Sequence, residues 1–251
     1  MQANNIDEVL SILENIIDES KQNNDTLGYF AALYKKVTRK VKEGIDQNYF
    51  DNNERMELLD VVFANRYIKA YYDYKERRDI TNSWSQAFLL SKDYWPIVLQ
   101  HLLIGMNAHI NLDLGIATAE VSKNQDIEDL HDDFNKINQI LSSLVKEVEE
   151  ELSAIWPTLK KILKYTKKVD NFFVDFSMEL ARDGAWNFAK QLHNTKPVDL
   201  QNTINTRDEK IAQKATIISK PGFVVSLLFS LIRLGEKGSI TEKITVLNSP
   251  N

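Results

Sequence analysis

Residues 95–120, WPIVLQHLLIGMNAHINLDLGIATAE, decide the fold of this chain. The stretch is long, contains no Lys or Arg, and consists mostly of Leu, Ile, Val, Met and Ala, so a helix formed here has no face suited to water. Polar residues interrupt every window of about 20 residues that could cross a bilayer, which argues against a membrane span. We therefore predict a buried central helix over about Trp95–Glu120, surrounded by other helices.

The polar residues of this stretch fall on two sides of the predicted helix. His109 and Asp113 are one turn apart on one face, whereas Asn107 and Asn111 lie together on nearly the opposite side. A buried carboxylate is costly unless it is paired, and a histidine one turn away supplies either a hydrogen-bonding partner or a second metal ligand. Two interpretations stay open: a polar network that holds neighbouring helices in register, and a chemical site in the core of a bundle.

Arg66 and two aromatic residues extend this group. Arg66 lies in the apolar run VVFANRYIKA, residues 61–70. Its guanidinium either points into the bundle toward a carboxylate such as Asp113, or reaches the surface along its aliphatic stem. Tyr67 and Trp84 are expected in the core, where they would line an aromatic cavity.

The composition favours one all-α domain over residues 1–251. Eight glycines and five prolines are too few for the turns of a sandwich, barrel or Rossmann sheet of this length, and 43% hydrophobic residues suit a globular protein. The net charge of −5, evenly spread, argues against nucleic-acid binding. The absence of cysteine excludes disulfides and thiol chemistry. The acidic, amphipathic start shows no secretory signal, so we expect a cytoplasmic location.

Three segments after the central helix carry their own expectations. A long helix is predicted over about Val169–His193. The polar stretch NTKPVDLQNTINT, residues 194–206, is predicted to be a long flexible loop. Beyond Gly235 we expect a loose tail, and the sequence indicates no particular oligomeric state.

The segment GMNAHINLDL, residues 105–114, together with FANRY at 63–67, Trp84 and the weaker ARDGAW at 181–186, resembles a bacterial all-helical group of unknown function, family 5995. The similarity extends over most of the chain. The resemblance implies a helical fold and directs attention to Asn107, His109, Asn111, Asp113 and Arg66, but it implies no activity.

Metal binding is the first chemical alternative. His-x-x-x-Asp in HINLD is similar to the pair found in zinc-dependent helical phospholipases and nucleases. Those enzymes need many histidines, whereas this chain has four. A site for one or two divalent metal ions, with His109 and Asp113 as ligands and carboxylates completing it, stays open.

The leading hypothesis is a helical bundle that binds a small or amphiphilic molecule in an internal cavity. In an enzyme, His109 would be a general base or metal ligand, Asp113 would orient it, and Arg66 would bind an anionic group of the substrate. The predicted ligand-binding residues are Asn107, Asn111, Tyr67 and Trp84. The alternatives are a non-catalytic scaffold or interaction module, in which these residues only fix helix packing, and a metal-dependent hydrolase or lyase.

Overall fold

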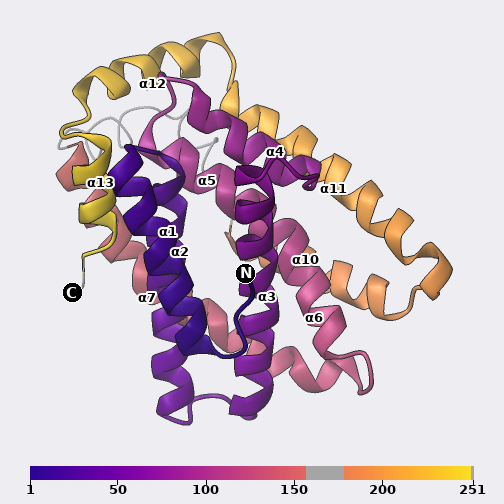
Figure 1. The fold of residues 1–251 in the computed structure, drawn as a ribbon. Helices are drawn as coiled ribbons and strands as arrows, with labels where there is room; N and C mark the ends of the chain where they lie inside the picture. The colour runs from indigo at the N-terminus through magenta and orange to yellow at the C-terminus, as the bar shows by residue number, and fades with distance from the viewer. Residues whose placement is uncertain (157–177, 250–251) are drawn as a thin grey trace.

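The computed structural model describes residues 1–156 and 178–249, and these residues form helices with no strand among them, which confirms the all-α prediction (Figure 1). The first half of the chain contains α1 (Ile6–Asn23), α2 (Leu27–Asp46), α3 (Asn53–Lys75), α4 (Asn82–Leu89) and the short 3-10 turn η1 (Leu90–Lys92). The second half contains α5 (Val98–Ala108), η2 (His109–Leu114), α6 (Gly115–Val121), η3 (Ile127–Leu130), α7 (His131–Ile155), α10 (Met178–His193), α11 (Pro197–Ser219), α12 (Phe223–Gly235) and α13 (Ile240–Leu247).

The N-terminal helices form because their ends are capped and one face of each is apolar. The side chain of Asn5 accepts a hydrogen bond from the backbone of Glu8 at the start of α1, and Asn52 does the same at the start of α3. Helix α1 packs an apolar stripe, which includes Val9 and Leu13, against α2 and α3. These helices provide one wall of the core.

Helices α5 and α6, joined by η2, form one continuous buried rod that contacts α2, α3, α4, α10 and α11. This confirms the predicted central helix, although the rod begins at Val98 because Pro96 precedes it and Trp95 is about half exposed. Its middle segment, η2, is a π-helix, in which the backbone hydrogen bonds join residues five apart instead of the four of an α-helix. The wide turn carries both His109 and Asp113.

Two glycines let neighbouring helices approach the rod on either side of η2. A Cβ atom added at Gly105 would lie 2.5 Å from the ring of Phe30 on α2. One added at Gly115 would lie 2.7 Å from the ring of Phe188 and 2.9 Å from the carbonyl oxygen of Ala185, both on α10. Glycine at these positions therefore brings α2 and α10 against the segment that carries the polar residues.

The C-terminal region differs from two predictions. Residues 197–206, expected to be loop, begin α11, because Pro197 occupies the first turn, where its missing N–H costs nothing. The expected loose tail contains α13, which starts with a capping box between Ser239 and Glu242 and buries Ile244 against α1, α2 and α7. The predicted helix from about residue 169 is observed from Met178 to His193, and its earlier part lies outside the described residues.

Helix α11 runs along one side of the molecule, and α12 crosses one end (Figure 1). Within residues 1–156 and 178–249, no single helix combines the length and the apolar content needed to cross a membrane. Helices α11 and α12 meet those criteria only as a pair bent by 64°.

Candidate functional site

Asp113 connects three helical segments in the core. Its Oδ1 accepts a hydrogen bond from Nε of Arg66 on α3 at 2.8 Å. Its Oδ2 accepts one from Nε1 of Trp84 on α4 at 2.8 Å and lies 3.2 Å from Nδ1 of His109. Of the two arrangements left open for Arg66, the structure shows the pairing with Asp113, and Trp84, expected to line a cavity, donates a hydrogen bond to the same carboxylate.

Electrostatics set the protonation of this group. Burial alone would raise the pKa of Asp113, but Arg66, His109 and Trp84 together hold it below its ordinary value. Burial lowers the pKa of His109 below its ordinary value and outweighs the opposite effect of Asp113. At neutral pH, therefore, Asp113 is ionised and His109 is neutral. Because a carboxylate only accepts hydrogen bonds, the proton of His109 is on Nδ1, and Nε2 carries the free lone pair.

The ring of His109 is held by aromatic neighbours. It stacks on Phe63 with a centroid distance of 3.6 Å and an interplanar angle of 7°, and it meets the edge of Tyr34 at 4.5 Å. Its Nε2 is buried and has no hydrogen-bond partner in the described part of the chain. An oriented, neutral imidazole with a free lone pair can accept a hydrogen bond or a proton.

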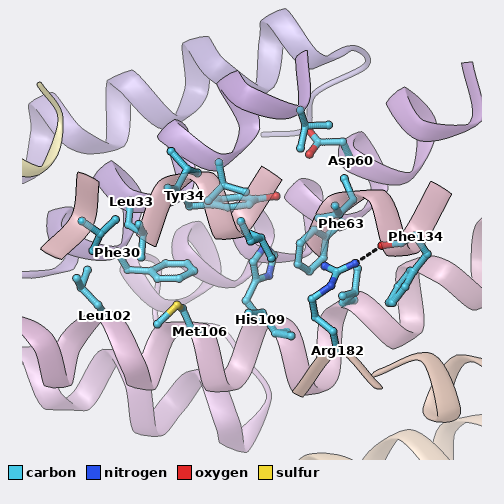
Figure 2. A pocket seen from close by; sticks show the side chains of 18 of the residues that line it. Phe30, Leu33, Tyr34, Asp60, Phe63, Leu102, Met106, His109, Phe134 and Arg182 are labelled. Atoms are coloured by element: carbon cyan, nitrogen blue, oxygen red, sulfur yellow. Dashed lines mark hydrogen bonds between the residues drawn. The ribbon is translucent and has the colours of Figure 1, made fainter. Parts of the chain in front are cut away.

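His109 lines an elongated cavity of about 610 Å³ between α2, α3, the α5–η2 rod and α7 (Figure 2). Along α7 the lining runs from Phe134 to Ser153, a distance of about 28 Å at 1.5 Å per residue. Most of the lining is aliphatic or aromatic. The apolar stripe of α7 therefore faces open space as well as neighbouring side chains.

Three further polar residues line the cavity with an unpartnered buried atom. These atoms are Oδ2 of Asp60, the hydroxyl of Tyr34 and Nε of Arg182, for which the described residues offer no hydrogen-bond partner. Burial, and secondarily the charge of Glu57, raises the pKa of Asp60 to about 8, so its carboxyl is mainly protonated at neutral pH. Arg182 donates to the backbone carbonyl of Phe134 and lies over its ring at 4.4 Å.

Sequence reasoning missed these three residues as site residues. Asp60 had a readable signal, because it interrupts the apolar run LLDVVF at residues 58–63. Arg182 lies in the ARDGAW segment, whose charged residues resemble an ordinary surface ion-pair pattern on one helix. Only the approach of α10 to α7 places its guanidinium in the cavity.

The asparagine pair does not belong to this site. Nδ2 of Asn111 donates to Oδ1 of Asn107 at 3.3 Å, and Nδ2 of Asn107 donates to the carbonyl of Ile211 at 3.1 Å. Nε of Arg207 donates to the carbonyl of Asn111 at 3.0 Å. Both asparagines therefore attach the rod to α11, on the side away from His109, which agrees with their predicted face but not with a role in ligand binding beside His109.

Two other predicted residues also lie outside the cavity lining. Tyr67 is buried and packs against Trp84, with 5.1 Å between the ring centroids. The side chain of Arg66 is 27% exposed and faces a second, polar cleft of about 770 Å³, which Trp84 and Asp113 also line. Arg66 thus pairs with Asp113 from the cleft side, where it cannot reach a molecule in the cavity.

The donor set does not suit a divalent metal ion. In residues 1–156 and 178–249, no three His, Cys, Asp or Glu side chains are grouped to hold one. Both oxygens of Asp113 are occupied by N–H donors, and one of these is a guanidinium, whose positive charge opposes a cation at this position.

These features define a class of protein: an all-helical bundle with a long, partly open cavity between its helices and a buried His–Asp pair whose histidine lines that cavity. The chain belongs to a family of unknown function, DUF5995, whose sequence model matches residues 6–221. No curated protein and no solved structure matches the chain.

Proposed function

We propose that this protein binds one elongated, apolar or amphiphilic molecule in the cavity between α2, α3, the rod and α7. The observation that carries the proposal is the group of unpartnered buried atoms on His109, Tyr34, Asp60 and Arg182, all in the lining of one cavity. Fifteen buried side-chain atoms of the described residues lack a hydrogen-bond partner, and the fact that four of them line one cavity supports a ligand that supplies partners there.

The size and lining of the cavity support the same proposal. A volume of about 610 Å³ lies within the range of about 300–1,000 Å³ that small-molecule pockets occupy. Water fits such a lining poorly, because each buried water needs two to four polar partners. An apolar occupant instead gains the hydrophobic free energy of leaving water.

His109 has a defined role toward such a molecule. Asp113 fixes its tautomer and orientation, so Nε2 accepts a hydrogen bond from a hydroxyl or N–H group of the ligand. If the bound molecule has an acidic proton at this position, the same lone pair acts as a general base, and Asp113 stabilises the imidazolium that forms. A binding protein and an enzyme would both use this arrangement.

The scaffold alternative has one observation in its favour. Asp113 accepts hydrogen bonds from α3, α4 and its own segment, so it holds these helices together whether or not a ligand binds. That function explains Asp113, Arg66 and Trp84. It leaves the cavity and the free Nε2 of His109 without a role.

A neutral environment-sensitive dye, Nile red, tests the proposal. The substitution Val37→Trp places an indole in the cavity lining, whereas Val198→Trp adds the same group at an exposed position on α11. We expect one saturable site in the wild type, at least tenfold weaker binding in Val37→Trp and unchanged binding in Val198→Trp. Wild-type affinity in a folded Val37→Trp protein would contradict the proposal.

A further inference from the structure

Arg182 is a buried cation, and none of the carboxylate side chains that the structure describes forms an ion pair with it. Its side chain is only 4% exposed. A guanidinium has five N–H donors, and the carbonyl of Phe134 accepts from one of its nitrogens. Burial lowers the pKa of Arg182 to about 10, with Asp183 acting in the opposite direction, so the group stays charged at neutral pH.

The charges of the cavity do not balance. Among the described lining residues, Arg182 is the only Lys or Arg, and the carboxyl groups are those of Asp60 and Glu149. Asp60 is mainly protonated at neutral pH, as described above, and Glu149 is exposed to solvent. The described part of the cavity interior therefore carries one positive charge, and a buried charge without compensation costs several kcal/mol.

The residues labelled in Figure 2 differ between the two ends of the cavity, and Glu149 and Ser153, on the part of α7 far from Phe134, also line it. Arg182, Asp60 and Phe134 lie together at one end, Leu33 and Leu102 lie at the opposite end, and His109 lies between them. A molecule that fits this distribution has a head with one negative charge and a long apolar body.

We propose that the ligand is a long-chain carboxylate, with its head group on the guanidinium of Arg182 and its chain running past His109 toward Leu102. A carboxylate matches the planar N–H groups of arginine, and a single cation selects a singly charged head over a phosphate. This inference rests on the proposed function, because it names the chemical class of the molecule that the cavity binds.

Dodecanoate and dodecanol test the inference, since they share one chain and differ in the charge of the head. Each is titrated against protein loaded with Nile red, at neutral pH and below the micellar concentration. We expect wild-type protein to bind dodecanoate at least tenfold more tightly than dodecanol. Arg182→Met keeps an apolar stem without the charge, and we expect it to lose this preference while still binding dodecanol.

Arg207→Met is the matched control. Arg207 is also partly buried, donates to backbone carbonyls and lies over a phenylalanine ring, but it lines neither end of the cavity. We expect this variant to keep the wild-type preference. Equal affinity of wild-type protein for the two ligands would overturn the inference and leave the proposed function standing, and this result does not depend on how any variant folds. Failure of the wild type to bind Nile red, dodecanoate and dodecanol would overturn the proposed function itself.

Discussion

Replacing Asp113 with asparagine should destabilise the protein more than any comparable change of a surface aspartate. Only the oxygen of the amide accepts hydrogen bonds, so the asparagine keeps the hydrogen bonds from Trp84 and His109 if its NH₂ group turns toward Arg66. Breaking a buried ion pair costs about 3–5 kcal/mol, and we reduce this because the side chain of Arg66 is 27% exposed and can turn into the polar cleft. The expected loss is about 2–4 kcal/mol.

Thermal unfolding followed by circular dichroism measures this effect. For a chain of this size, about 2–4 °C per kcal/mol converts the loss into a decrease in Tm of about 4–16 °C. Asp93→Asn removes the same charge at an exposed position and should change stability by no more than about 0.5 kcal/mol. A Tm of Asp113→Asn within about 1 °C of the wild-type Tm, which is about the precision of the method, would show that Asp113 does not connect these helices as described.

Three further predictions follow from other parts of the structure. Gly115→Ala should cost about 1–3 kcal/mol of stability, because its methyl group meets a backbone oxygen on α10 that cannot turn away; chemical denaturation that shows no loss would exclude this tight contact. Burial raises the pKa of Asp60 to about 8, so the native state binds one more proton than the unfolded state between about pH 4 and 8. As the pH rises through that window, the free energy of unfolding of the wild type should therefore decrease relative to that of Asp60→Asn by about 1.4 kcal/mol per pH unit. Parallel stability profiles of these two proteins would show that Asp60 is not buried as described. Nitrogen NMR of labelled histidine should show His109 neutral and protonated on Nδ1 at neutral pH, and a proton on Nε2 would remove the proposed acceptor.

The sequence predicts the central helix because its burial depends on local pattern, whereas for Arg66 it offers a carboxylate such as Asp113 only as one of two alternatives. A run without Lys or Arg indicates burial on every side, and a buried Asp113 requires a cationic or hydrogen-bonding partner, which Arg66 supplies. The π-turn was missed, because counting at 3.6 residues per turn places His109 and Asp113 on one face whether or not the turn is widened.

The cavity could not be predicted, because it depends on how distant helices pack. The apolar stripe of α7 looks the same in sequence whether it packs against another helix or lines an open space. Likewise, Arg182 and Asp60 meet the same cavity only because α10 and α3 both approach it. The helix α13 was misjudged for a related reason: its short apolar face is convincing only once α1, α2 and α7 are there to cover it.

If the cavity holds a long-chain acid with its head at Arg182, the methyl end of the chain lies at the other end of the cavity, and photo-crosslinking can locate it. A long-chain acid with a diazirine at its methyl end is bound, irradiated, and mapped by peptide mass spectrometry. We expect labelling at the end of the cavity away from Arg182, on α5 near Leu99 and Leu102, and loss of that labelling in Val37→Trp. The exposed apolar face of α12, formed by Phe223, Leu227, Leu231 and Leu234, is the competing surface. Labelling concentrated there, and unaffected by Val37→Trp, would contradict the account.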